Sequence, residues 1–247
     1  MRAVAVIPAR WGSTRFPGKS LALIAGKPLI QRVLERCRQA KRLDDLLVAT
    51  DDERIQKAVT ALGARVVMTR RGHLSGTDRV AEAVRGCQAE VVVNVQGDEP
   101  LIDPNLIDRL VAVMLAGSEW DMATAAAPLG ADEARQSSIC KVVVAADGRA
   151  LYFSRAPIPY IRERDFQVAE TIYWRHIGIY AYRAAFLATL AAAESCLLER
   201  AECLEQLRAL YLGGRIKVET VAQTSLGVDT PEDVGKVEAA LREAGLT

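Results

Sequence analysis

The sequence carries almost no net charge and has no long apolar run. Its 32 Lys and Arg residues balance 31 Asp and Glu residues, so neither a broad nucleic-acid surface nor a membrane-surface patch is expected. The apolar run at the N-terminus meets a proline after a few residues, which is too early for a signal sequence. We therefore expect a cytoplasmic protein with no nucleic-acid partner and no membrane partner.

Cysteine and histidine are also scarce. The five cysteines are scattered without a C-x-x-C pair, which excludes a disulfide framework and a zinc site and is typical of thiols in a reducing compartment. Low-complexity linkers and internal repeats are missing too. Half of the 247 residues are hydrophobic, so the sequence predicts a single domain over residues 1–247 with a sizeable core.

Short apolar runs alternate with amphipathic helical patterns in the first half of the chain. The runs are Ala3–Ile7, Leu46–Thr50, Val66–Thr69 and Val91–Val95. The helical patterns are Pro28–Ala40, Glu53–Leu62, Asp78–Arg85 and Pro104–Ala116. Continuous apolar runs are typical of strands that are covered on both faces. This repetition predicts an α/β fold with a doubly wound, mostly parallel sheet and helices on both faces.

The pattern changes after about Met122. Two β runs flank Asp147-Gly148 within Cys140–Ser154, which is a hairpin signal. Another strand is expected at His176–Arg183, so the sheet should include an antiparallel excursion near residues 140–183. Two further helices are expected at Leu197–Leu212 and Pro231–Ala244.

The loop after the first apolar run is close to a P-loop but departs from it. A P-loop places four residues between its two glycines, whereas five separate Gly12 from Gly18. Pro17 removes one backbone donor, and the residues after Lys19 meet Gly26 too soon for the long helix that a P-loop requires. A P-loop is therefore not expected.

Three cations nevertheless crowd this loop, namely Arg10, Arg15 and Lys19. A loop at the carboxyl end of the first parallel strand lies where ligands bind in doubly wound folds. Glycines let the backbone approach phosphates, and cationic side chains neutralise them. We interpret the loop as a polyphosphate site; the alternative is a plain connection with accidental glycines.

Carboxylates follow another strand. Asp98 lies in the polar segment Gln96–Pro100 directly after the apolar run, and Asp229 lies in the segment "GVDTPED". Mg²⁺ takes one or two protein carboxylates and completes its shell with phosphate oxygens and water. Asp98 and Asp229 are therefore candidate magnesium ligands, with an ordinary polar turn as the alternative.

Eight motifs in order then resemble one family nearly end to end. They are "IPAR…ST-R-FPGK", "ATDD", "SGTDR", "VNVQGDEP", "ALYFSRAPIP", "RHIGIYAYR", "LEQLRAL" and "GVDTPED". The sequence resembles the 3-deoxy-manno-octulosonate (Kdo) cytidylyltransferases of the nucleotide-diphospho-sugar transferase superfamily. The resemblance implies that CTP and the sugar acid Kdo react to give CMP-Kdo and pyrophosphate, for lipopolysaccharide biosynthesis. It also implies Mg²⁺ as cofactor and a homodimer formed partly through residues 140–183.

The resemblance also assigns roles to individual residues. Lys19, Arg10 and Asp98 are implied to be catalytic, and Asp98 and Asp229 to hold the metal. The implied nucleotide-binding residues are Arg10, Ser13, Thr14, Arg15, Lys19, Ser75, Gly76, Thr77, Arg79 and Gln96. The implied sugar-binding residues are Gln96, Arg155, His176, Tyr180, Glu205 and Gln206, with Arg155 or His176 suited to the sugar carboxylate.

Simpler alternatives remain open for several of these residues. Ser75 or Thr77 can cap a helix, His176 can be a satisfied strand residue, and Glu205 can belong to a solvated helix face. The substrate can instead be 8-amino-Kdo or a sialic-acid-like sugar, or the chain can be a non-catalytic nucleotide-binding relative. The segment Ile161–Trp174 matches no interpretable motif and is expected to be a variable loop.

Overall fold

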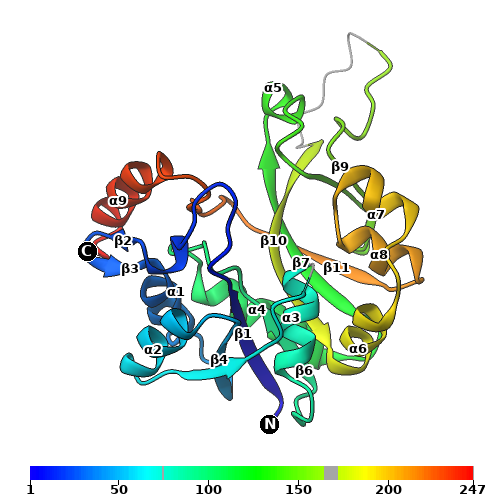
Figure 1. The fold of residues 1–247 in the computed structure, drawn as a ribbon. Helices are drawn as coiled ribbons and strands as arrows, with labels where there is room; N and C mark the ends of the chain where they lie inside the picture. The colour runs from blue at the N-terminus through cyan, green and yellow to red at the C-terminus, as the bar shows by residue number, and fades with distance from the viewer. Residues whose placement is uncertain (74, 164–171, 247) are drawn as a thin grey trace. The chain divides into compact units, whose positions relative to one another are not determined.

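A computed structural model describes residues 1–73, 75–163 and 172–246 of the chain. It divides into two compact units, the first formed by Met1–Ala112 and Ser225–Thr247 and the second by Val113–Thr224. Each unit has its own strands and helices (Figure 1). The single domain expected over residues 1–247 stays a prediction.

The first unit contains a parallel sheet with strand order β6-β1-β4-β5. The strands are β1 (Ala3–Ala9), β4 (Asp45–Thr50), β5 (Arg65–Met68) and β6 (Val91–Asn94). Because β1 pairs with β4 on one side and β6 on the other, its residues 3–7 are fully buried. The carboxyl ends of β1 and β6 therefore lie side by side.

Helices connect these strands close to the predicted positions. They are α1 (Leu29–Cys37), α2 (Glu53–Ala61), α3 (Gly76–Ala83) and α4 (Pro104–Ala116), the last of which contains the boundary between the units. Asp52 caps α2 by accepting a hydrogen bond from the Arg54 amide at 2.9 Å. Ser75 caps α3 in the same way with the Asp78 amide at 3.1 Å. These caps satisfy amides that have no partner within the helix.

The C-terminal helix α9 (Asp233–Glu243) returns to the start of the chain. Figure 1 shows it in red beside the blue hairpin of β2 (Leu23–Ile24) and β3 (Lys27–Pro28). Glu238 accepts a hydrogen bond from the Ala25 amide at 2.7 Å. Ile24, Leu29, Val228, Val237 and Leu241 form a buried cluster there. The helix begins at Asp233 rather than at the predicted Pro231.

The second unit contains the antiparallel pairing that was predicted. Its strands are β7 (Met122–Leu129), β8 (Lys141–Val144), β9 (Ala150–Ser154), β10 (Tyr173–Arg183) and β11 (Ile216–Thr220). β8 and β9 form a hairpin around Asp147-Gly148, and β10 runs antiparallel to both β7 and β8. β7 and β11 pair in parallel. The α/β class with a mostly parallel sheet and an antiparallel excursion is therefore confirmed.

Four helices accompany these strands in the described part of the second unit. They are α5 (Ala131–Ala134), α6 (Ala184–Ala192), α7 (Leu197–Glu202) and α8 (Gln206–Tyr211). The single helix predicted over Leu197–Leu212 is divided into α7 and α8, because Cys203 adopts the left-handed conformation with φ 53° and ends α7. Of the predicted variable loop Ile161–Trp174, residues 164–171 lie outside the described residues. No described helix combines the length and apolarity needed to cross a membrane.

Candidate active site

The cationic loop after β1 folds back on itself around one carbonyl group. The amides of Ser13 and Gly18 both donate to the Trp11 carbonyl at 2.9 Å. Gly18 has φ 73°, and a Cβ atom there would lie 2.9 Å from the Trp11 ring, so this position requires glycine. The loop ends in a single 3-10 turn, Lys19–Leu21. Since no long helix follows, the loop lacks the helix that backs a P-loop.

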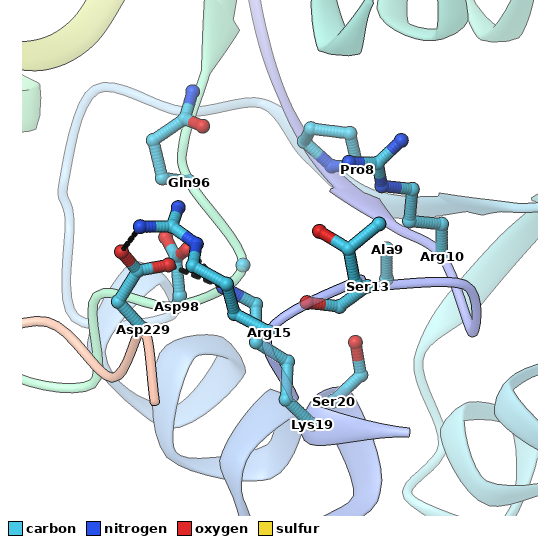
Figure 2. Close-up of a pocket in the computed structure, with 12 residues that line it drawn as sticks. Pro8, Ala9, Arg10, Ser13, Arg15, Lys19, Ser20, Gln96, Asp98 and Asp229 are labelled. Atoms are coloured by element: carbon cyan, nitrogen blue, oxygen red, sulfur yellow. Dashed lines mark hydrogen bonds and ion pairs between the residues drawn. The ribbon is translucent and has the colours of Figure 1, made fainter. Parts of the chain in front are cut away.

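The loop forms one wall of a cavity of about 230 Å³ at the carboxyl ends of β1 and β6 (Figure 2). The lining residues are Pro8, Ala9, Arg10, Ser13, Thr14, Arg15, Lys19, Ser20, Gln96, Gly97, Asp98 and Asp229. Cavities that enclose drug-sized ligands usually measure about 300–1,000 Å³. The cavity therefore suits a compact polar part of a ligand, such as a row of phosphates.

Two cations and two carboxylates meet at this cavity. The Lys19 ammonium lies 2.5 Å from an Asp98 carboxylate oxygen and 3.8 Å from an Asp229 oxygen, and it donates to the Val228 carbonyl at 3.2 Å. Arg15 forms an ion pair with the other Asp229 oxygen. The Lys19 side chain is 16% exposed and that of Arg15 is 68% exposed. The structure therefore brings two of the three predicted phosphate-binding cations and both predicted metal ligands into one cluster.

Arg10 and Gln96 line the same cavity but stand outside the ion-pair cluster. Arg10 is exposed, and in the view of Figure 2 it lies apart from the cluster, near Pro8. Gln96 donates to the Asn94 side-chain oxygen at 3.3 Å. The next residue, Gly97, allows β6 to approach β1, because a Cβ there would lie 2.9 Å from the Pro8 carbonyl oxygen. Close approach of the two strand ends thus depends on glycine.

Glu99 is a feature of the site that sequence reasoning missed. Its carboxyl group accepts a hydrogen bond from the Ser225 hydroxyl at 2.5 Å. Burial raises the pKa of Glu99 to about 7, and the neighbouring Asp98 charge acts in the same direction, while the Ser225 bond and Lys19 oppose it. In the sequence, Glu99 is one more acid in a polar strand end. No local signal distinguishes it from an exposed turn residue.

The segment Ser75–Arg79 opens α3, and its side chains are largely engaged within the protein. Arg79 is 3% exposed; it donates to the Thr69 hydroxyl at 2.5 Å and to Asp51 at 2.8 Å. Gly76 lies beside the end of β1, since a Cβ there would be 3.6 Å from the Pro8 ring. The helix-cap alternative therefore holds for Ser75. Binding of the base by this segment stays a prediction.

Three of the predicted sugar-binding residues gather in the second unit. The Tyr180 hydroxyl donates to the Gln206 side-chain oxygen at 3.4 Å, and the rings of His176 and Tyr180 are 5.5 Å apart. The Gln206 amide in turn donates to the Cys140 sulfur at 3.6 Å. Burial raises the pKa of Tyr180 well above its ordinary value, so its hydroxyl stays protonated. These groups can exchange hydrogen bonds with hydroxyls but supply no positive charge.

The contacts of His176 indicate which of its ring nitrogens carries a hydrogen, and burial determines its charge. Its Nε2 lies 3.0 Å from the Thr124 hydroxyl, whose oxygen is also 3.1 Å and 2.8 Å from the carbonyls of Ile177 and Ile179. The hydroxyl has one proton to give and two carbonyls to receive it, so it accepts from Nε2–H of His176. Burial lowers the pKa of His176 to about 3. Burial therefore disfavours the charged form of His176 that would best pair with a carboxylate.

Arg155, by contrast, presents a permanent charge. Its guanidinium donates to the backbone carbonyls of Glu202 at 2.8 Å, Ser137 at 3.2 Å and Cys203 at 3.5 Å. The Glu202 carboxylate accepts from the Arg155 backbone amide at 2.8 Å and so fixes the end of β9. Of the two residues proposed for a sugar carboxylate, the charge state favours Arg155.

Glu205 lies in the connection between α7 and α8 and is partly buried. The solvated helix face suggested by the spacing of its acidic neighbours is not formed. Instead Glu199 is buried and its carboxylate is paired with Arg208. The Arg208 Nε lies 3.0 Å from one carboxylate oxygen, and its Nη2 lies 3.1 Å from the other. Glu205 itself stays a predicted sugar contact.

The acidic pair of the cavity fits a magnesium ion. Among the residues that the structure describes, no group of three or more His, Cys, Asp or Glu side chains is arranged to hold a metal. Mg²⁺ needs no such cage, because it uses one or two carboxylates together with phosphate oxygens and water. Asp98 and Asp229, which converge on Lys19, meet that requirement.

Comparison with known proteins points in the same direction. A family model described as cytidylyltransferase matches residues 4–217. The 3-deoxy-manno-octulosonate cytidylyltransferase of Syntrophotalea carbinolica is 51% identical, covering 98% of this chain and 99% of the relative. That of Bdellovibrio bacteriovorus is 48% identical over the full length of both chains.

A solved structure of CMP:2-keto-3-deoxy-manno-octonic acid synthetase complexed with CTP is 43% identical to this chain, with a TM-score of 0.93. The match covers 99% of this chain and 100% of the chain in that structure. A cytidylyltransferase from Leptospira borgpetersenii, at 18% identity and a TM-score of 0.67, shares the fold alone. These comparisons confirm the predicted α/β fold class over the whole length.

Proposed function

We propose a reaction for this chain on the premise that it belongs to the cytidylyltransferase family, among the 3-deoxy-manno-octulosonate cytidylyltransferases. The chain converts CTP and Kdo to CMP-Kdo and pyrophosphate, a step that supplies activated sugar for lipopolysaccharide biosynthesis. The structural observation that best supports this proposal is the cluster of Arg15, Lys19, Asp98 and Asp229 at the carboxyl ends of the strands. An enzyme that transfers a nucleotidyl group needs positioning and charge neutralisation more than covalent chemistry.

In this reaction the anomeric hydroxyl oxygen of the sugar forms a bond to the α-phosphorus of CTP. The bond from that phosphorus to the oxygen shared with the β-phosphate breaks, pyrophosphate leaves with both electrons, and the hydroxyl proton is released. Negative charge grows on the leaving group. Lys19, which Asp98 and the Val228 carbonyl hold in place, is suited to stabilise that charge. Arg10 and Arg15 would bind the triphosphate from the same loop.

Asp98 and Asp229 would hold Mg²⁺. When bound, the ion would neutralise phosphate charge and polarise the phosphorus–oxygen bonds. The remaining nucleotide contacts would come from Ser13, Thr14 and the segment Ser75–Arg79.

Sugar-binding roles are proposed for Gln96 in the first unit and, considered by themselves, for side chains of the second unit. Arg155 is suited to the carboxylate, because its charge is permanent and its protein acceptors are carbonyl groups. Neutral His176, Tyr180 and Gln206 are suited to hydroxyl groups, and Glu205 would accept from another.

The enzyme is also proposed to be a cytoplasmic homodimer. In the described part of the second unit, β9 pairs with β8 on one side, and Arg149, which precedes β9, forms an isolated bridge with Lys217 of β11. Leu151 on this strand is 51% exposed. An apolar strand edge of this kind is usually covered. Sedimentation at micromolar concentration should give twice the chain mass of 26.9 kDa; a monomer would contradict the dimer.

A pyrophosphate-release assay tests the reaction. It compares the four nucleoside triphosphates with Kdo, 8-amino-Kdo and a sialic acid, with and without Mg²⁺. We expect release with CTP and Kdo that depends on the metal. No release with this pair, or equal turnover with ATP or GTP, would overturn the proposal.

A further inference from the structure

Two segments that are far apart in the sequence must be held next to each other to bring Asp98 and Asp229 together. Asp98 follows β6, whereas Asp229 precedes α9 in the segment 225–229. The segments touch closely: the Val228 amide donates to the Asp98 carbonyl at 2.8 Å. A Cβ on Gly227 would lie 3.2 Å from the same carbonyl oxygen. The acidic pair therefore depends on how the segment 225–229 is attached.

One end of this segment is firmly anchored. Val228 is fully buried in the apolar cluster beside α9. On its C-terminal side, the amides of Asp229 and Thr230 both donate to the Asp233 carboxylate, at 3.1 and 3.0 Å. These contacts fix the backbone from Val228 onward, but they do not hold the residues before it.

The other end has no regular structure and an exposed apolar side chain, since Leu226 is 47% exposed. A hydrogen bond from the Ser225 hydroxyl to the Glu99 carboxyl, 2.5 Å long, fastens this end. Glu99 follows Asp98 directly, so this bond ties the start of the segment to the residue next to the other acid. The Glu99 amide also donates to the Gln96 carbonyl at 3.3 Å, within the same turn.

We propose that Glu99 and Ser225 form a clasp that positions Asp98 and Asp229 as a pair for the divalent cation. Glu99 acts as a positioning residue, because its carboxyl group accepts a hydrogen bond from Ser225. This inference deepens the proposed function and rests on its metal site. Breaking the clasp frees residues 225–227 and loosens the spacing of the two acids, while the loop cations and Asp98 itself stay in place.

The test compares Glu99→Ala, Ser225→Ala, the double variant and Glu99→Gln, with exposed Glu119→Ala as the matched control. Two readouts do not depend on catalysis: Mn²⁺ affinity in the presence of CTP, by electron paramagnetic resonance, and hydrogen exchange of residues 225–229 without metal. The third readout is the Mg²⁺ concentration for half-maximal activity. Glu99→Gln keeps an acceptor oxygen for Ser225 and should behave like the unaltered chain.

We expect either alanine variant to weaken Mn²⁺ binding and raise the half-activating Mg²⁺ about fivefold, as expected for one buried hydrogen bond. Exchange at 225–229 should accelerate, kcat at saturating Mg²⁺ should change less than about twofold, and the double variant should be no worse than either single one. Unchanged exchange and Mn²⁺ affinity in Ser225→Ala, which removes only a hydroxyl group, would overturn the clasp. Additive losses would also overturn it. An unaltered chain that binds Mn²⁺ and CTP but transfers nothing to Kdo would contradict the reaction and not the clasp.

Discussion

The charge state of His176 is a prediction that can be worked out quantitatively. Its Nε2–H donates to the buried Thr124 hydroxyl, and burial of the ring lowers its pKa from 6.5 to about 3. The unfolded chain binds a proton at this histidine below pH 6.5, whereas the folded chain does so only near pH 3. The contribution to stability is therefore complete above pH 6.5 and is lost as the pH falls toward 3.

The size of the loss follows from these two values. At pH 5, protonation of this histidine in the unfolded chain lowers the free energy of unfolding by about 2 kcal/mol. At pH 7 the same effect is only a few tenths of a kcal/mol. His176→Gln keeps an amide donor for Thr124 and cannot be protonated in this range. The free energy of unfolding of the unaltered chain should therefore fall by about 2 kcal/mol more than that of His176→Gln between pH 7 and pH 5.

Urea unfolding at several pH values measures that difference. Proton NMR gives a direct check, because the chain has two histidines and His73→Gln assigns their signals. His73→Gln also serves as the matched control for removing a histidine. A His176 ring signal that titrates near pH 6.5, or parallel pH curves for the unaltered chain and His176→Gln, would refute the reasoning. Such a result would also restore His176 as a candidate for the sugar carboxylate.

Three further changes test other parts of the structure. Lys19→Ala should lower kcat by about 10²–10³-fold, because it removes a preorganised cation that stabilises the leaving group. Steady-state kinetics with saturating CTP measure this change, and a loss confined to KM would contradict it. Gly97→Ala should lower the free energy of unfolding by about 1–3 kcal/mol, since its Cβ would lie 2.9 Å from the Pro8 carbonyl oxygen. Urea unfolding measures this change, and Gly117→Ala is the control, because the space around Gly117 is open. Cys203→Gly should raise the free energy of unfolding by about 0.5 kcal/mol by relieving the left-handed φ of 53°. Cys203→Ala should not raise it, and equal effects of the two would contradict the strain.

The parallel half of the fold was predictable because its signals are local. Continuous apolar runs such as Val91–Val95, and caps such as Asp52, specify where strands and helices begin. The β8–β9 hairpin could likewise be read from Asp147-Gly148. The alanine-rich strand β7 escaped prediction, since its sequence "MATAAAPL" has a low intrinsic preference for strands and becomes one through pairing with β10 and β11.

The candidate site was predictable residue by residue but not as an arrangement. Cations at one strand end and an acid at another indicated phosphates and a metal. Nothing in the order of the residues shows that Lys19 would contact both acids, or that Ser225 would bond to Glu99 across 126 positions. The neutral state of His176 is likewise set by burial, and the Thr124 hydroxyl that contacts its Nε2 comes from another strand. Long-range contacts decide these properties, and a single sequence does not encode them locally.

The ion-pair cluster changes how substitutions in the site must be interpreted. The Lys19 side chain is only 16% exposed, and Asp98 is the nearer of its two carboxylate partners. Removing the acid with Asp98→Ala would leave a largely buried ammonium group without its closest partner. The Lys19 side chain would then no longer be held in its present position. Lost activity in Asp98→Ala would therefore report on the phosphate clamp as well as on the metal. Asp98→Asn keeps an acceptor oxygen for Lys19 but provides a poorer metal ligand. The difference between these two variants separates the roles, because the phosphate clamp and the metal site share the same carboxylate.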